Sequence, residues 1–244
     1  MKTYVVVLPA RMGSKRLLGK PLIKIGGIPM IIRTYLQCKK AINKKDIYVA
    51  TDSLQIKKIC DQYGAQCVMT SKKCLTGTDR VAEVAKKIKA KFYINVQGDE
   101  PFFNPIDLKK LIKCAKKNPQ DVINGYTKIK DKKLYNDPSI PKLVFDKNYN
   151  LIYMSRAAIP SNKKYNFKIA WRQVCAYSFP KNSLKFFSSF KSKSPIEKIE
   201  DIEILRFIEN GINVKMLEMS NQSISIDKKK DLNKAKLYLK MKKY

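Results

Sequence analysis

The sequence predicts an α/β protein built on a mostly parallel, doubly wound sheet. Strand and helix patterns alternate through the first half of the chain, a rhythm typical of βαβ units. A buried apolar run at 5–8 ends in a glycine-containing basic loop, as at the ligand-binding edge of such sheets. The second half is richer in strand patterns. At 244 residues, the chain is long enough to bury a sizeable core.

Apolar periodicity and turn residues define the elements of the first half. Apolar runs predict strands, and apolar residues three and four positions apart predict helices. Pro29 stands near the start of the first helix, while Gly64 and Pro119 mark the ends of two later ones. The predicted strands cover 5–8, 47–50, 66–69 and 92–96, and the predicted helices cover 28–41, 54–63, 78–89 and 106–116.

The second half predicts a strand-rich region followed by two helices. Ser194 and Pro195 form a good N-cap and first-turn pair for a helix over 195–209, which Gly211 ends. We treat 1–244 as a single domain in which 126–180 form a β-rich lobe beside the first half. The predicted strands cover 142–145, 151–154, 174–179, 214–217 and 223–226, and the closing helix covers 228–240.

The loop after the first strand carries the strongest chemical signal. Its glycines let the backbone come close to a ligand, and its four cations suit a polyphosphate. A solvated basic loop in a lysine-rich protein is the alternative, because the loop matches neither the G-x-x-x-x-G-K-[ST] nor the G-x-G-x-x-G pattern. The residues concerned are Arg11, Gly13, Ser14, Lys15, Arg16, Gly19 and Lys20.

The chain has no histidine, and its six cysteines include no C-x-x-C pair. These features argue against zinc fingers, zinc hydrolases and any Ser-His or Cys-His catalytic unit. We interpret the thiols as reduced and structural. An enzymatic function must therefore work through carboxylates, metal ions or positioned cations.

The formal charge of +31 raises the question of nucleic-acid binding. Only seven of the 51 basic residues are arginine, and lysines occur in every segment, so the charge indicates a compositional bias more than one binding footprint. The charge should speed the association of small anions. No apolar stretch of about 18 residues predicts a membrane span, and the N-terminal run is too short for a secretion signal. We expect a cytoplasmic protein without a nucleic-acid partner.

Two carboxylates each follow a predicted strand. Asp99 lies in the turn after 92–96, and Asp227 follows 223–226. At the carboxyl ends of strands the two could share a Mg²⁺ ion with a triphosphate. Each also fits an ordinary turn or helix-capping role, and the sequence does not show that they meet.

A third group of residues precedes a predicted helix. Thr76, Gly77 and Arg80 stand where backbone N–H groups can receive base or phosphate oxygens, although a plain helix cap has the same pattern. A fourth group suits a hydroxylated acid. There an arginine would bind the carboxylate and the other side chains the hydroxyls, although each alone fits a structural role. This group comprises Arg156, Tyr177 and Glu203.

Together these segments resemble one family, the 3-deoxy-manno-octulosonate (Kdo) cytidylyltransferases, also called CMP-Kdo synthetases. The similarity runs from end to end in the same order. The segments are VVLPARMGSKRLLGKPL at the start, YVATD, VMTSKKCLTGTDR, INVQGDEP, PKLVFD, LIYMSRAAIP, IEDIEILRFIENG and SISIDKKKDL. The combination of the basic loop, GTDR, VQGDEP and YMSRAAIP is highly specific.

The resemblance implies a fold, a reaction and site residues. Members have a Rossmann-like sheet with helices on both faces and a smaller β-rich dimerisation lobe. They transfer CMP from CTP to the anomeric hydroxyl of a 2-keto sugar acid and release pyrophosphate, with Mg²⁺ as cofactor, in lipopolysaccharide or capsule synthesis. In-line attack at the α-phosphorus needs positioning and neutralised charge more than a dedicated base. The chain is thus expected to be a homodimeric enzyme.

The implied residues fall into four sets. The triphosphate would be held by Arg11, Ser14, Arg16 and Lys20, and the cytidine or sugar would lie near Ala10, Thr76, Gly77, Arg80 and Gln97. The metal would be bound by Asp99 and Asp227. The sugar acid would face Arg156, Tyr177 and Glu203, together with Gln97 and Gln173. The expected catalytic residues are Arg11, Arg16, Lys20 and Asp99.

Three positions depart from the family pattern. Leu18 replaces a proline in the loop, Gln173 stands where typical members have a histidine, and Ile204 replaces a glutamine. The last two lie in sugar-facing segments and point to an altered acceptor side. The expected acceptor is Kdo, and the alternative is another 2-keto sugar acid, such as an amino-substituted Kdo or a sialic-like acid. The sequence also leaves open a nucleotidylyltransferase that uses UTP or GTP and a basic nucleic-acid-binding protein.

Overall fold

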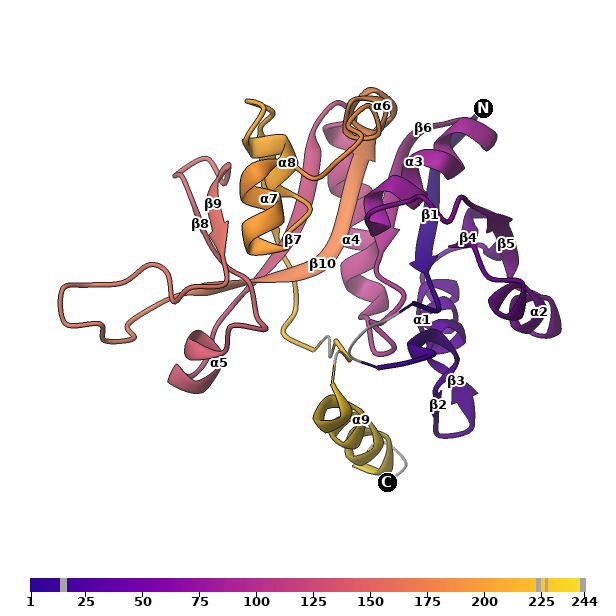
Figure 1. Ribbon diagram of the computed structural model, residues 1–244, viewed down its shortest axis with the longest axis horizontal. Coiled ribbons are helices and arrows are strands. Elements are labelled where there is room, and N and C mark those ends of the chain that lie inside the picture. The colour runs from indigo at the N-terminus through magenta and orange to yellow at the C-terminus, as the bar shows by residue number, and fades with distance from the viewer. Residues whose placement is uncertain (14–16, 223–224, 227, 242–244) are drawn as a thin grey trace.

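The computed structural model describes residues 1–13, 17–222, 225–226 and 228–241. Its centre is a nine-stranded mixed sheet whose main path runs in the order β11-β7-β10-β6-β1-β4-β5 (Figure 1). The predicted α/β class, with a mostly parallel sheet between two helical layers, is confirmed. In the described part of the chain no helix is long and apolar enough to cross a membrane.

The first half forms the parallel part of the sheet. β1 pairs in parallel with β4 and β6, and β4 pairs in parallel with β5. Each strand is followed by a helix, as the alternating pattern predicts. The elements are β1 (Lys2–Ala10), α1 (Met30–Lys39), β4 (Ile47–Thr51), α2 (Leu54–Gln62), β5 (Gln66–Met69), α3 (Gly77–Lys87), β6 (Ala90–Val96) and α4 (Pro105–Lys117).

Short elements connect these strands and helices. A small hairpin precedes α1, which starts at Met30 because Pro29 at its N-cap has an extended backbone. The helix predicted over 28–41 therefore begins two residues later than expected. The connecting elements are η1 (Lys20–Leu22), β2 (Lys24–Ile25), β3 (Ile28–Pro29) and η2 (Lys44–Asp46).

The second half adds an antiparallel strand to the middle of the sheet. β10 (Trp171–Pro180) lies antiparallel between β6 and β7 (Val122–Lys128), and β11 (Val214–Glu218) pairs in parallel with β7. β7 is not among the predicted strands, although its run VINGYTK is almost entirely buried. Two short helices, α5 (Lys132–Asn136) and α6 (Lys181–Phe187), are also absent from the prediction.

The single helix predicted over 195–209 is wrong. The chain forms α7 (Pro195–Glu200) and α8 (Leu205–Ile208), separated by Asp201 in the left-handed conformation at φ 51°. The break lets the Glu200 carboxylate bind strand β9 while Leu205 stays in the core, so tertiary contacts override the helical periodicity. α9 (Lys229–Met241) closes the chain, as predicted.

The predicted strand over 223–226 is not present in its described part. Ser225 and Ile226 belong to no strand, and Ser223 and Ile224 lie outside the described residues. The N–H of Ile226 donates to the Asp99 carbonyl at 3.1 Å, so the chain at this point is held against the turn after β6.

Residues 126–180 contain the strand-rich projection on the left of Figure 1. β8 (Lys142–Phe145) pairs antiparallel with β9 (Leu151–Ser155) and with the first residues of β10. The rings of Phe145, Tyr126 and Trp171 pack together where this projection joins the sheet. The long segment between β9 and β10 extends furthest from the sheet (Figure 1).

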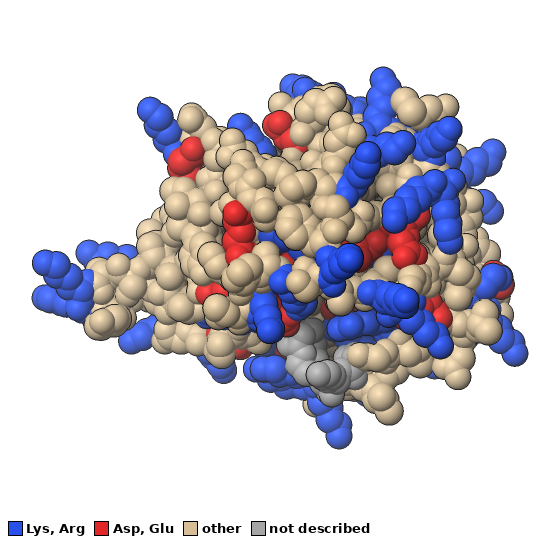
Figure 2. Space-filling model, turned by 45° about the horizontal axis from the view of Figure 1, so that its top comes forward, with Lys and Arg blue, Asp and Glu red and all other residues tan. Residues whose placement is uncertain are grey.

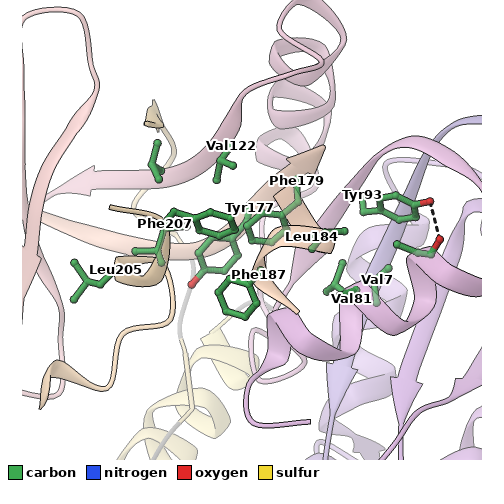
Figure 3. Close-up of a cluster of buried hydrophobic side chains, with 14 of the residues drawn as sticks. Val7, Val81, Tyr93, Val122, Tyr177, Phe179, Leu184, Phe187, Leu205 and Phe207 are labelled. Atoms are coloured by element: carbon green, nitrogen blue, oxygen red, sulfur yellow. Dashed lines mark hydrogen bonds between the residues drawn. The ribbon is translucent and has the colours of Figure 1, made fainter. Parts of the chain in front are cut away.

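The sheet has an apolar core on each face. On one face, α3, α6 and α8 cover a cluster in which the rings of Tyr177, Phe179 and Phe207 stack in succession (Figure 3). On the other face, α1, α2 and α4 cover a second cluster around Leu8 and Ile94. The rigid sheet between these clusters holds the loops at its edge in place.

Candidate active site

A cavity of about 510 Å³ opens at the carboxyl ends of β1 and β6. Its walls come from the loop after β1, the start of α3, the turn after β6 and two residues of the second half. The lining residues are Pro9, Ala10, Arg11, Lys20, Pro21, Met30, Cys74, Leu75, Thr76, Gly77, Arg80, Gln97, Gly98, Asp99, Arg156 and Asp201. This is the edge at which open α/β sheets bind ligands.

Basic side chains are not confined to the cavity. Figure 2 shows lysine and arginine spread over the whole visible face, with acidic side chains between them. The positive charge of this face is therefore not gathered in one patch, as a lysine-rich composition predicts.

Gly98 brings the backbones of β1 and the β6 turn into contact. A side chain at this position would place its Cβ 2.6 Å from the Pro9 carbonyl oxygen and 2.9 Å from Ile31 Cδ1. The Thr34 hydroxyl donates to the Gly98 carbonyl at 3.0 Å and fixes the turn from the helix side. Only glycine fits there, and the close approach places Asp99 at the mouth of the cavity.

Lys20 and Asp99 meet inside the cavity. Lys20 Nζ lies 2.5 Å from Asp99 Oδ2. Gly19, at φ 64°, turns the chain into η1 and so directs Lys20 toward the β6 turn.

Three of the predicted site residues, Ser14, Arg16 and Asp227, lie outside the described residues.

The start of α3 forms another wall of the cavity. Thr76 and Asp79 make a capping box, in which the Thr76 N–H donates to Asp79 at 2.8 Å and the Asp79 N–H donates to the Thr76 hydroxyl at 3.3 Å. Gly77 is pressed against Gln97, whose Nε2 would lie 2.9 Å from an added Cβ. The absence of a side chain at Gly77 therefore lets the Gln97 amide lie directly against this helix terminus.

Glu203 lies behind this wall and connects it to the second half. Its carboxylate accepts the Thr78 N–H at 3.1 Å and the Gln97 side-chain amide at 3.0 Å. Burial raises the pKa of Glu203 above its ordinary value, and the Thr78 N–H opposes that shift. Glu203 therefore fixes the Gln97 side chain at the cavity.

Arg80 lines the cavity, but its guanidinium is mostly committed to the protein. It donates to Thr70 Oγ1 at 2.7 Å, to the Ser71 carbonyl at 3.2 Å and to Asp52 at 2.9 Å. Asp52 balances the charge of this buried side chain. Arg80 thus ties the ends of β4 and β5 to the start of α3.

Arg156 reaches the cavity from the end of β9. Its guanidinium donates to the carbonyls of Glu200, Pro138 and Asp201, the last at 3.0 Å. The fully buried Lys142 ammonium holds the Arg156 carbonyl at 2.5 Å, and burial lowers the pKa of that lysine. The arginine is therefore clamped at both its backbone and its side chain.

Tyr177 and Gln173 do not line the cavity. Both are buried on β10, where Gln173 Nε2 donates to the Tyr177 hydroxyl at 3.2 Å and to Asn124 Oδ1 at 3.0 Å. Asn124 in turn donates to two carbonyls at the β10 bulge. Burial raises the pKa of Tyr177 well above its ordinary value, so the hydroxyl stays neutral.

The residues that hold Arg156 were not predicted from the sequence. Glu200 accepts hydrogen bonds from Ser155 at 2.6 Å and from the Arg156 N–H at 2.8 Å, and Asp201 lines the cavity. Lys142 is a third such residue. The three lie 14 to 45 positions from Arg156 in the sequence, so no local pattern indicates the contacts.

The described residues contain no group of three or more histidine, cysteine or acidic side chains suited to a metal ion. Asp99 is an acidic residue that lines the cavity and lies beside the Lys20 ammonium. Mg²⁺ in proteins is commonly held by one or two carboxylates with substrate phosphates and water. A Mg²⁺ site built on Asp99 would fit this pattern of coordination.

Residues 5–229 match the family described as "Cytidylyltransferase". The chain is 34% identical to the 8-amino-3,8-dideoxy-manno-octulosonate cytidylyltransferase of Shewanella halifaxensis, over 93% of this chain and 94% of the relative. It is also 34% identical to the 3-deoxy-manno-octulosonate cytidylyltransferase of Protochlamydia amoebophila, over 96% of this chain and 93% of the relative. A solved CMP:2-keto-3-deoxy-manno-octonic acid synthetase complexed with CTP superposes with a TM-score of 0.90 at 30% identity, over 99% and 100% of the two chains. The chain belongs to the cytidylyltransferase family.

Proposed function

We propose that this protein transfers CMP from CTP to the anomeric hydroxyl of a 2-keto-3-deoxy sugar acid and releases pyrophosphate. The observation that carries the proposal is a single cavity with the Lys20–Asp99 pair and the start of α3 on one side and Arg156 on the other. One side suits a triphosphate and the other a carboxylate. The names of the relatives above agree with such a pair of substrates.

The nucleotide side is our name for the part of the cavity lined by Pro9, Ala10, Arg11, Lys20, Thr76, Gly77, Arg80, Gln97, Gly98 and Asp99. Arg11 and Lys20, with Ser14 and Arg16, would bind the triphosphate and stabilise the departing pyrophosphate. Ala10, Thr76, Gly77, Arg80 and Gln97 would surround the cytidine or the adjoining sugar. Because Gly77 has no side chain, the Gln97 amide packs closely against the start of α3, beside the ligand that we expect there.

Asp99 and Asp227 are the residues that we expect to hold Mg²⁺. Ile226, next to Asp227 in the chain, is hydrogen-bonded to the Asp99 backbone, which supports this pairing. The bound cation would neutralise phosphate charge and lower the pKa of a coordinated sugar hydroxyl. Arg11 and Lys20 would add fixed positive charge, so the reaction needs no histidine base.

The acceptor side comprises Arg156, Asp201, Glu203, Tyr177 and Gln173. Arg156 would bind the sugar carboxylate, because its clamped guanidinium is held in a fixed orientation. Gln97 and Glu203 would bind hydroxyls. Gln173 and Tyr177 lie behind these residues, so they would contact the sugar only if the cavity deepens when it binds.

Two acceptors are favoured, Kdo and 8-amino-3,8-dideoxy-manno-octulosonate. Relatives named for each of them match over most of the chain, and the second is kept because Gln173 and Ile204 depart from the pattern of the Kdo enzymes that the sequence resembles. A pocket that hydrogen-bonds one terminal group discriminates strongly against another.

We also propose that 126–180 form a dimerisation lobe and that the protein is a cytoplasmic homodimer. Exposed apolar side chains on β9 and in the projecting segment, such as Ile152, Tyr165 and Ile169, support a protein contact there. Sedimentation velocity should show a dimer, and Ile152→Lys should shift it toward the monomer.

The test of the function is pyrophosphate release by the purified protein with Mg²⁺. Each of CTP, UTP, GTP and ATP is paired with Kdo, its 8-amino analogue and a sialic acid. We expect turnover with CTP and one of the two octulosonates. Equal turnover with all four nucleotides, or none with CTP and any acid, would overturn the proposal, and tight, steeply salt-dependent RNA or DNA binding without turnover would favour a nucleic-acid-binding function.

A further inference from the structure

The Lys20–Asp99 ion pair occupies the position on which the proposed reaction depends. Lys20 Nζ lies 2.5 Å from Asp99 Oδ2, and both side chains line the cavity. Their side chains are 11% and 28% exposed, so the pair is largely shielded from water. A shielded pair of this geometry is stronger than an ion pair on the open surface.

The backbone holds each member of the pair independently. The Lys20 N–H donates to the Leu17 carbonyl at 3.1 Å, and the Lys20 carbonyl accepts the Ile23 N–H at 3.2 Å within η1. On the other side, Gly98 packs against the Pro9 carbonyl, and the Glu100 N–H closes the turn onto Gln97 at 3.1 Å. The two charges are therefore brought together by the fold of two separate segments.

Lysine has the properties of a displaceable counter-ion. Its ammonium is a compact point charge on a flexible four-carbon stem, whereas an arginine would grip a carboxylate with a rigid fork. The ammonium can move from Asp99 to a nearby anion without movement of the η1 backbone. A triphosphate in the cavity would be such an anion.

We propose that Lys20 is a built-in counter-ion of Asp99 that prevents a divalent cation from binding before the nucleotide. Before the nucleotide binds, the ammonium neutralises Asp99 and repels a second cation. When CTP enters, the Lys20 ammonium leaves Asp99 and pairs with the phosphates. The Asp99 carboxylate then becomes available to the cation that is bound to the nucleotide. The inference rests on the proposed function and adds an order of binding to it.

The direct test is Mn²⁺ binding, measured from the electron paramagnetic resonance signal of the free ion, with no acceptor present. Wild type, Lys20→Met, Lys20→Arg and Lys24→Met are titrated without and with saturating CTP, and the Mn²⁺ bound by the same CTP without protein is subtracted. Lys24 is an exposed neighbour outside the cavity and serves as the matched control. The Lys20→Arg variant keeps the charge and should keep the block.

Without CTP, we expect Lys20→Met to bind Mn²⁺ about tenfold more tightly than wild type, because one repelling charge has been removed. The Lys24→Met and Lys20→Arg variants should stay close to wild type. CTP should strengthen Mn²⁺ binding more in wild type than in Lys20→Met. Mn²⁺ affinity of Lys20→Met within twofold of wild type, or wild-type affinity that does not change with CTP, would overturn the proposal.

Two controls separate the possible failures. Circular dichroism melting shows whether Lys20→Met folds, and Lys20→Gln replaces it if it does not. Adding Asp99→Asn to the Lys20 variant should abolish the gain in Mn²⁺ affinity and so locate it at Asp99. Pyrophosphate release by wild type tests the proposed function separately. A protein without turnover can still show the predicted Mn²⁺ pattern, which contradicts only the proposed function. An active protein can lack that pattern, which contradicts only the counter-ion role of Lys20.

Discussion

The two sides of the cavity are built in different ways. The side that we propose binds the nucleotide consists of short local segments after β1 and β6 and at the start of α3, and close contacts at Gly98 and Gly77 set its shape. On the acceptor side, Arg156 is held by three carbonyls from two other places in the chain, Pro138 and the adjacent residues Glu200 and Asp201. The first side is therefore a property of a few motifs, and the second is a property of the whole fold.

A buried ion pair joins the two sides. Arg206 donates twice to Glu197, at 2.7 and 2.8 Å, and lies 3.6 Å from Asp79 in the α3 capping box. All the bonds of the Arg206 guanidinium are made in the core, since Arg206 and Glu197 are fully buried. This pair fixes the broken α7–α8 segment against the helix that forms the nucleotide side.

The largest effect is expected on the nucleotide side, from Asp99→Ala. Because Asp99 lines the cavity on an already formed turn, the variant should fold normally and lose CMP transfer by at least about 10³-fold. Pyrophosphate release and melting temperature measure the two properties. A variant that keeps near-full turnover would show that Asp99 has no part in the mechanism. The distinction between a nucleotide side and an acceptor side would then lose its support.

The next prediction tests the buried Arg206–Glu197 ion pair that joins the two sides. Arg206→Met leaves Glu197 charged and unpaired in the core, which should lower the free energy of unfolding by about 3–5 kcal/mol. Urea denaturation of the single variant measures this loss. Replacing both members, Arg206→Met with Glu197→Leu, should recover most of it. A single variant within about 1 kcal/mol of wild type would mean that the pair does not hold the two sides together.

A smaller effect is expected on the acceptor side from Glu203→Gln. The neutral amide is a weaker hydroxyl partner for the sugar acid and a weaker acceptor for the Gln97 amide, so the KM for the sugar acid should rise about tenfold, with a smaller rise for CTP. Steady-state kinetics with each substrate varied in turn checks this split. An equal rise in both KM values would show that Glu203 serves the two sides alike.

The same variant has a predicted pH dependence. Because burial raises the Glu203 pKa in the folded state, the folded protein holds this proton more tightly than the unfolded chain does. The contribution of Glu203 to stability is thus greatest below its ordinary pKa and falls as pH rises through the raised value. Denaturation from pH 4 to 7 should show wild type losing stability relative to Glu203→Gln, and the opposite slope would contradict the assigned burial.

More of the predicted site residues line the cavity in the segments proposed to bind the nucleotide than in those proposed to bind the acceptor. The strand-loop pattern at 5–20, the turn at Asp99 and the cap at Thr76 are local, and they led to residues that line one cavity. The break at Asp201 could not be predicted, because the apolar spacing of 195–209 continues through it and the deciding contact is between Glu200 and β9. β10 was predicted as a strand, but its antiparallel direction depends on where the chain enters the sheet.

The smallest effect concerns Gln173, which stands where the resemblance leads one to expect histidine. Gln173 donates two hydrogen bonds, to Asn124 and Tyr177, and a neutral imidazole has only one N–H. Gln173→His should therefore cost about 0.5–1.5 kcal/mol of stability at pH 7.5 through one lost hydrogen bond. Burial disfavours a charged imidazole, so the folded-state pKa falls below the unfolded value of about 6.5, and the deficit should grow as pH drops below it. Melting of both proteins at pH 5.5 and 7.5 measures the change. A deficit that is the same at both pH values would show that this end of β10 admits water, and the acceptor side would then be more open than the buried Gln173–Tyr177 pair indicates.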